Sequence, residues 1–231
     1  VFSRTGLIFI LILIEAGGLG ILTYISFLMT VSSKKISVVN GNLIKDFYID
    51  DIDFNPKSIL KKIILFTLLI QFIGSILLIP GLYKAGDQHF IFNSIFLSIS
   101  AFCNAGFSPS SDSLSGFSGN WYVLSIIMGL IILGGIGFVV FTNIAQKIRF
   151  AKKGQIFYLS LHVKIVLIST VVLIISGFIF TFISFYKTSL WEIPLSKRIL
   201  TALFESVTLR TAGFETIPQT SFTSSASLFH L

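Results

Sequence analysis

Four long apolar runs constrain this 231-residue chain most strongly, because each can cross a lipid bilayer as a helix. They cover residues 7–29, 60–82, 121–144 and 163–185. A membrane span takes about 20 apolar residues, so each run is long enough with some tilt. Only 12% of the residues are charged, against roughly 25% in soluble domains. The sequence therefore predicts an all-α integral membrane protein.

Basic residues indicate which connecting segments face the cytoplasm. They gather after the first and third runs, at Lys34, Lys35, Lys45, Lys57, Lys61 and Lys62, and at Lys147, Arg149, Lys152, Lys153 and Lys164. The segment 83–120 carries only Lys84. Because positive loops remain inside, we expect residues 31–59 and 147–162 in the cytoplasm and 83–120 and 186–231 outside. This topology explains the net charge of +7 better than nucleic-acid binding does.

Two shorter apolar stretches, 89–102 and 193–209, lie in the segments expected outside. A helix of about 14 residues is about 21 Å long, which is less than the roughly 30 Å hydrocarbon core. A crossing at 89–102 would also move the next basic loop to the wrong side. We therefore expect re-entrant helices that enter from outside and return as loops. Pro194 suits the first turn of the later helix, and Ser196 is its expected cap.

The chain repeats itself around these stretches. Ala105-Gly106-Phe107 matches Ala212-Gly213-Phe214, so Asn104 and Thr211 precede the alanine at equivalent positions. "AGGLGI" at 16–21 matches "LGGIGF" at 133–138, which pairs Gly17, Gly18 and Gly20 with Gly134, Gly135 and Gly137. The repeat unit is a span, a re-entrant helix with its loop, and a second span. Residues 1–30 are then the last span of a first repeat, 60–146 a complete second repeat, and 163–231 a truncated third.

Two spans per unit make successive units parallel, so their loops converge on one side and around one axis. Inverted-repeat transporters would alternate in orientation. A glycine in each loop permits positive φ, and carbonyls turned toward one axis can replace the water shell of a cation. The C-terminal end of each short helix also favours a cation. We therefore predict potassium-channel-like architecture with Gly106 and Gly213 in a filter, although ordinary turn glycines are the simpler alternative.

"SAFCNAGF" and "SVTLRTAGFETI" resemble the second and third filter loops of the Trk/Ktr/HKT superfamily of potassium transporters, and "LIEAGGLGI" resembles the span after its first filter. The resemblance is strongest to the bacterial Trk and Ktr membrane subunits and covers nearly the whole chain. It implies four such units around one pore, so that this chain, which begins at Val1, is a fragment. The implied filter positions, which bind K⁺ through backbone carbonyls, are Cys103, Asn104, Ala105, Gly106, Arg210, Thr211, Ala212 and Gly213.

The resemblance also implies partners and a location. The family forms homodimers with a cytosolic nucleotide-binding regulatory subunit, and the expected site is the bacterial plasma membrane, crossed several times. It places a flexible gating loop in the span after the third filter, beyond this chain. No nucleic-acid partner and no cofactor are expected, with K⁺ as the transported ion.

Several side chains have more than one reading. Arg210 is expected to point away from the pore and to brace the filter by pairing with an acid, either Glu205, Glu215 or a residue in absent segments; direct pore electrostatics is the alternative. Asn104 and Thr211 either brace the loops or contribute only carbonyls. For Glu15, inside the first span, three alternatives stay open: it bonds the backbone of a returning loop, lies near an interface or remains protonated.

The remaining features carry less functional information. The glycine motifs at 16–21 and 133–138 favour close helix approach over a hinge. His89, His162 and His230 lack metal-ligand spacing, and no arrangement typical of a nucleophile with its base, of phosphate binding or of paired catalytic carboxylates is present. We therefore expect no enzyme and no side-chain metal site.

The leading hypothesis is potassium uptake through a central pore with a backbone-carbonyl filter. Its first alternative is a symporter that couples K⁺ to Na⁺ or H⁺. The second is an assembly or anchoring subunit without transport activity, in which the Ala-Gly-Phe loops would pack against a partner.

Overall fold

The structure, a computed structural model, describes residues 3–18, 56–184 and 194–217, and within them the chain forms helices and no strand. This confirms the all-α prediction for the described residues. The elements are α1 (Arg4–Gly18), α4 (Pro56–Lys84), α5 (Phe90–Phe102), the 3₁₀ helix η1 (Ser115–Phe117), α6 (Trp121–Ile136), α7 (Phe138–Lys152), α8 (Leu161–Ser184) and α9 (Leu195–Thr211).

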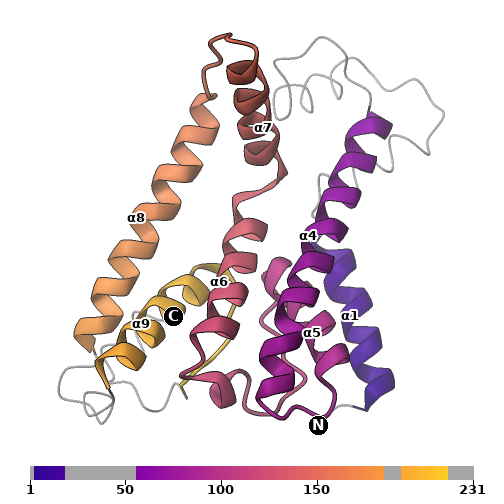
Figure 1. Cartoon of the computed structure of the whole chain (residues 1–231), viewed down its shortest axis with the longest axis vertical. Helices are drawn as coiled ribbons and strands as arrows, with labels where there is room; N and C mark the ends of the chain where they lie inside the picture. Colours follow the sequence, from indigo (N-terminus) through magenta and orange to yellow (C-terminus); the bar gives the residue numbers. More distant parts are fainter. Residues whose placement is uncertain (1–2, 19–55, 185–193, 218–231) are drawn as a thin grey trace. The chain divides into compact units, whose positions relative to one another are not determined.

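The chain divides into two compact units. One is Leu19–Ile70, of which the structure describes the first half of α4, residues 56–70. The other combines Val1–Gly18 with Gln71–Leu231. Within this larger unit α5 packs on α1 and α6, while α9 packs on α6 and α8 (Figure 1). All contacts described below lie inside this larger unit.

Two described helices are long and apolar enough to cross a membrane, Lys61–Lys84 within α4 and α8. A third crossing is made if α6 and α7 together count as one span. The predicted spans at 60–82 and 163–185 thus correspond to α4 and α8. The predicted first span, 7–29, is described only as far as Gly18, and its second half lies outside the described residues.

The span predicted at 121–144 is not one continuous helix. The helix stops at Ile136, and α7 starts at Phe138 with its axis turned by 92°. Gly137, between them, has φ 85° and ψ 153°, a conformation that essentially only glycine adopts without strain. The break therefore has a local cause in the backbone of one residue.

The two short helices occur where the sequence predicts them, as α5 and α9. Their 13 and 17 residues correspond to about 20 and 26 Å, less than the roughly 30 Å core. The expected cap at Ser196 is wrong, because Pro194 holds the N-cap position of α9 and Ser196 lies inside the helix. Proline suits this end, where the first helical amides have no partner within the helix.

Burial separates the short helices from the long ones. Phe96 of α5 and Phe204 of α9 are fully buried, whereas Phe72 of α4 and Ile168 of α8 are 64% exposed. Apolar side chains that point outward along a span are what a helix in contact with lipid requires. The buried faces of the short helices therefore form much of the interior of this unit.

Candidate functional site

The site consists of two glycine-centred loops that lie against each other. Loop A (residues 103–107) follows α5, and loop B (residues 210–214) ends α9 and continues beyond it. The Asn104 side-chain amide and Thr211 Oγ1 are 3.1 Å apart. A Cβ atom placed on Gly106 would collide with the carbonyl oxygen of Ala212. Two segments far apart in sequence are thus in direct contact.

The chain segments after the loops are also joined. The amide of Leu114 donates to the Glu215 carbonyl oxygen over 2.9 Å. The amide of Glu215 donates to Ser113 Oγ over 3.1 Å. The two loops are therefore held together both at their centres and on the side where the chain leaves them.

Both central glycines have positive φ, 71° at Gly106 and 77° at Gly213. Residues other than glycine adopt this backbone conformation only at a cost in free energy. The sequence therefore predicted correctly that these positions use the conformational freedom of glycine. Asn104 also has positive φ, 53°, which asparagine tolerates better than most residues.

The chain between the short helix and the loop alanine is one residue longer before loop A than before loop B. The Ser100 and Thr208 carbonyls accept from the amides of Ala105 and Ala212 over 2.9 and 2.8 Å. Ala105 is five positions after Ser100, but Ala212 is four positions after Thr208. Asn104 and Thr211 both directly precede the alanine, and the left-handed backbone of Asn104 accommodates the extra length.

The Asn104 side chain connects three elements. With its amide oxygen turned toward α6, it accepts from the Gly135 amide over 3.2 Å. Its nitrogen then donates to Thr211 Oγ1 over 3.1 Å and to the Ile131 carbonyl over 3.3 Å. In this orientation both ends of the amide are satisfied. The contact joins loop A, loop B and the last turns of α6.

Glu15 contacts the side of loop A through side chains. Its Oε2 accepts from Gln71 Nε2 over 2.8 Å and from the Cys103 thiol over 3.7 Å. Glu15 thus contacts the returning loop, as one of the alternatives expected, but through the Cys103 side chain and not through the backbone. The three residues link α1, α4 and loop A.

Glu205 is buried with 1% of its surface exposed. Its Oε1 accepts from Thr216 Oγ1 over 2.9 Å and from the Thr216 amide over 3.3 Å. Thr216 lies just beyond loop B, so this carboxyl group fixes the chain where it leaves the loop.

Arg210 pairs with neither of the two acids named for it in this chain. In the described part of the chain its guanidinium contacts neither Glu205 nor Glu215, and its Nη1 is buried without a hydrogen-bond partner. Its Nη2 lies where a Cβ of Gly135 would be. Gly135 is in the last turn of α6, whose carbonyls lack helical partners and favour a positive charge. Among the described residues the neighbour of Arg210 is thus a helix end, and the expected pairing with an acid in absent segments stays a prediction.

The glycine motifs permit these close approaches. A Cβ on Gly18 would collide with the Cys103 side chain, and one on Gly134 would collide with the Phe102 carbonyl oxygen. Close packing, the favoured prediction, is therefore confirmed for Gly18, Gly134 and Gly135. Gly137 is instead the residue at which the helix breaks between α6 and α7, and Gly20 lies outside the described residues.

We predict that Gly134→Ala lowers the free energy of unfolding by about 1–3 kcal/mol, the usual cost of overpacking. The collision is with backbone at the end of α5, which cannot rotate away as a side chain can. Thermal unfolding of the purified protein in detergent measures the effect. Gly129→Ala, in the same helix with open space around its Cβ, is the matched control, and equal midpoints for both variants would contradict the prediction.

Four hydroxyl groups escaped the sequence analysis. Ser98 and Ser206 donate to backbone carbonyls of the preceding long helix, and Ser100 and Thr208 donate to the carbonyls of Phe107 and Phe214. The signal in the sequence was that each short helix has a serine two positions before a second hydroxyl residue, a serine in α5 and a threonine in α9.

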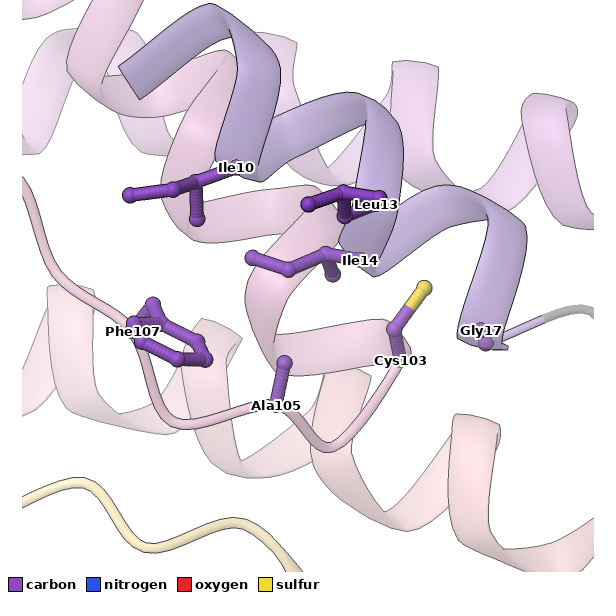
Figure 2. A pocket seen from close by; sticks show the side chains of 8 residues that line it. Ile10, Leu13, Ile14, Gly17, Cys103, Ala105 and Phe107 are labelled. Carbon is purple, nitrogen blue, oxygen red and sulfur yellow. The ribbon is translucent and has the colours of Figure 1, made fainter. Parts of the chain in front are cut away.

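An open pocket of about 350 Å³ lies between α1 and loop A. Figure 2 shows Ile10, Leu13 and Ile14 of α1 facing Ala105 and Phe107 across it. These apolar side chains offer no ligand to a cation, so any ligand on this side of loop A comes from the backbone.

The histidines and acids of the described ranges form no metal site. No group of three or more His, Cys, Asp or Glu side chains there could hold a metal ion. His89 is within 2.9 Å of Arg4 Nη2, and His230 lies outside the described residues.

The sequence matches a family of known proteins over nearly its whole length. A family model described as a cation transport protein, TrkH, matches residues 2–230. The Ktr system potassium uptake protein B of Vibrio alginolyticus is 32% identical over 98% of this chain and 50% of its own length. The potassium/sodium uptake protein NtpJ of Enterococcus hirae is 33% identical over 94% and 47%, and the Bacillus subtilis Ktr system potassium uptake protein B is 31% identical over 94% and 48%. The chain spans about half the length of these relatives.

Proposed function

The chain belongs to the TrkH family of cation transport proteins, and from this premise we propose that it forms part of a pore for potassium uptake across the bacterial plasma membrane. The predicted membership of the Trk/Ktr superfamily is confirmed by the match to nearly the whole chain. Members of this family are transporters and not enzymes. The Vibrio alginolyticus and Bacillus subtilis relatives are named as potassium uptake proteins.

The proposed filter is made by the backbone of loops A and B. Its residues are Cys103, Asn104, Ala105 and Gly106, with Arg210, Thr211, Ala212 and Gly213. The observation that carries this proposal is the contact between the loops, each with a central glycine at positive φ. Carbonyls held in this way replace the water around K⁺ without a cofactor or a charged side chain.

Two acids and one base support these loops in the proposal. Glu15 holds Cys103, Glu205 holds Thr216, and Arg210 places its charge against the end of α6. The bracing role expected of Arg210 thus acts through a helix end. Each of these side chains is fixed by its neighbours behind the backbone, which remains free to face the ion.

The proposed topology and partners follow the sequence. Residues 31–59 and 147–162 face the cytoplasm, and loops A and B are reached from outside by re-entrant helices α5 and α9 in parallel repeats. Two relatives are named as parts of a Ktr system, which supports association with other subunits. A homodimer and a cytosolic nucleotide-binding regulatory subunit are the partners proposed.

Bacterial cells without potassium uptake systems test the function. The intact protein is expected to restore growth at low external K⁺ and rubidium uptake, because the negative-inside potential draws cations inward. The same cells without the protein are the control. Failure of the intact protein to restore either, when correctly inserted, would contradict the proposal.

A coupled symporter is the second candidate function, favoured by the name of the Enterococcus hirae relative, a potassium/sodium uptake protein. Purified protein in liposomes separates the two mechanisms. An imposed Na⁺ or H⁺ gradient that moves K⁺ against its own electrochemical gradient indicates coupling, and K⁺ movement only down that gradient indicates a channel-like pore.

A further inference from the structure

The short helices α5 and α9 carry the same pair of buried hydroxyl residues two positions apart. Ser98 and Ser100 of α5 have none of their surface exposed, and Ser206 and Thr208 of α9 have 5% and 1%. In an apolar interior a hydroxyl group needs a hydrogen-bond partner. Each of the four has one outside its own helix, which is unusual, because helical serine and threonine often donate to their own helix instead.

The first hydroxyl of each pair fastens the short helix to the long helix before it. Ser98 Oγ donates to the Gln71 carbonyl of α4 over 2.7 Å, and Ser206 Oγ donates to the Ile174 carbonyl of α8 over 2.6 Å. Three positions later each long helix has a glycine, Gly74 or Gly177. A Cβ on either glycine would come within 2.6 Å of the same hydroxyl oxygen. The contacts of α5 with α4 and of α9 with α8 thus share one arrangement, a serine hydroxyl bonded to a carbonyl beside a glycine.

The second hydroxyl of each pair fastens the residue after the loop glycine. Ser100 Oγ donates to the Phe107 carbonyl over 2.7 Å. Thr208 Oγ1 donates to the Phe214 carbonyl over 3.0 Å and accepts from the Phe214 amide over 2.7 Å. The carbonyl of the phenylalanine after each glycine therefore already accepts a hydrogen bond from the short helix and is turned toward it.

We infer that these hydroxyl pairs are positioning residues for ion selectivity, an inference that rests on the proposed function. The span-facing hydroxyl sets the depth of the short helix. The loop-facing hydroxyl fixes the end of the filter and withholds the Phe107 and Phe214 carbonyls from the ion. The ligands left to K⁺ are then the carbonyls that precede each phenylalanine.

Loss of a loop-facing hydroxyl frees a carbonyl that can turn toward the ion. An added, mobile ligand adapts to the smaller Na⁺ as readily as to K⁺, so discrimination falls although uptake continues. A merely structural role would instead lower the amount of protein and leave the ion preference unchanged.

Competition of Na⁺ with rubidium uptake in cells that express the intact protein tests this inference. Ser100→Ala, which removes one hydrogen bond, is expected to lower the K⁺ over Na⁺ preference about fivefold to tenfold. Thr208→Val, which retains the shape and removes two, is expected to lower it at least as much. Thr208→Ser restores the hydroxyl and is expected to restore the preference. The double variant Ser98→Ala/Ser206→Ala is expected to shift the preference in the same direction.

Ser176→Ala is the matched control, because Ser176 is exposed and donates only within its own helix, to the Leu173 carbonyl. It is expected to behave as the unmodified protein. Unchanged ion preference in Thr208→Val and Ser100→Ala, with Gly106→Ser still impaired, would overturn this inference alone. Absence of potassium uptake by the unmodified protein would overturn the proposed function itself.

Discussion

Replacing Gly106 by serine is expected to reduce the K⁺ over Na⁺ preference of the intact protein by about tenfold to a hundredfold. Two effects combine at this position. Its φ of 71° puts any other side chain under strain of about 1–3 kcal/mol, and 1.4 kcal/mol corresponds to about tenfold. The new Cβ also collides with the Ala212 carbonyl oxygen, which is itself a proposed ligand. Sodium competition against rubidium uptake measures the change.

Gly213→Ser separates the two effects. Gly213 has φ 77° but open space around its Cβ, so strain acts alone, and a smaller loss of preference is expected than for Gly106→Ser. Gly86→Ser is the control for strain, because Gly86 has φ 81° and open space in the turn after α4, away from both loops. Unchanged selectivity in both loop variants would count against the filter assignment.

Replacing Glu205 by leucine is expected to abolish uptake and to destabilise the protein. Leucine fills the space but leaves the amide and hydroxyl of Thr216 without their acceptor, and an unsatisfied buried donor costs about 1–3 kcal/mol. Glu205→Gln retains a side-chain oxygen for both donors and is expected to retain most uptake. Uptake and the thermal midpoint in detergent are measured together for the two variants.

Thr216→Val provides a graded comparison for Glu205. It removes the hydroxyl donor, whose bond is 2.9 Å long, and leaves the backbone amide in place. An intermediate loss is expected. If Glu205→Leu and Glu205→Gln behaved alike, the negative charge or the size of the residue would matter more than its acceptor, and the proposed bracing of loop B would be wrong.

The sequence predicted the helices of the described ranges because hydrophobic length separates long spans from short helices. A 14-residue apolar stretch at 89–102 cannot reach across the bilayer core, whereas 163–185 can. The glycines of the two loops were recognised for a similar reason, since an isolated glycine in a repeated apolar context indicates unusual backbone. Hydrophobic length and an isolated glycine can both be read from one segment, without knowing what packs against it.

The break at Gly137 was missed because the apolar run continues through it. Nothing in the hydrophobicity of 121–144 distinguishes a straight helix from one that turns by 92°. Three glycines within four positions, at Gly134, Gly135 and Gly137, were a signal for such a break. They were assigned to packing, which is correct for the first two.

The hydrogen-bond partners of the polar side chains could not be predicted, because they depend on which elements pack against one another. Arg210 was expected to find an acid, but it lies at the end of α6, and the unpaired carbonyls of a helix end do not show in a sequence. The comparison of the two motifs aligned their glycines and so did not reveal the one extra residue between Ser100 and Ala105. Ser98 and Ser206 looked like ordinary helical serines, and only the packing of α5 on α4 and α9 on α8 gives their hydroxyls another partner.

The most direct test of the account is the position of bound ions in the intact protein. Rubidium or thallium, which replace potassium and scatter strongly, should give anomalous peaks on the axis beside the backbone of residues 103–106 and 210–213, at direct contact with their carbonyl oxygens. Ions bound instead through side chains, or peaks only outside these two loops, would contradict the proposal that the backbone carbonyls form the filter.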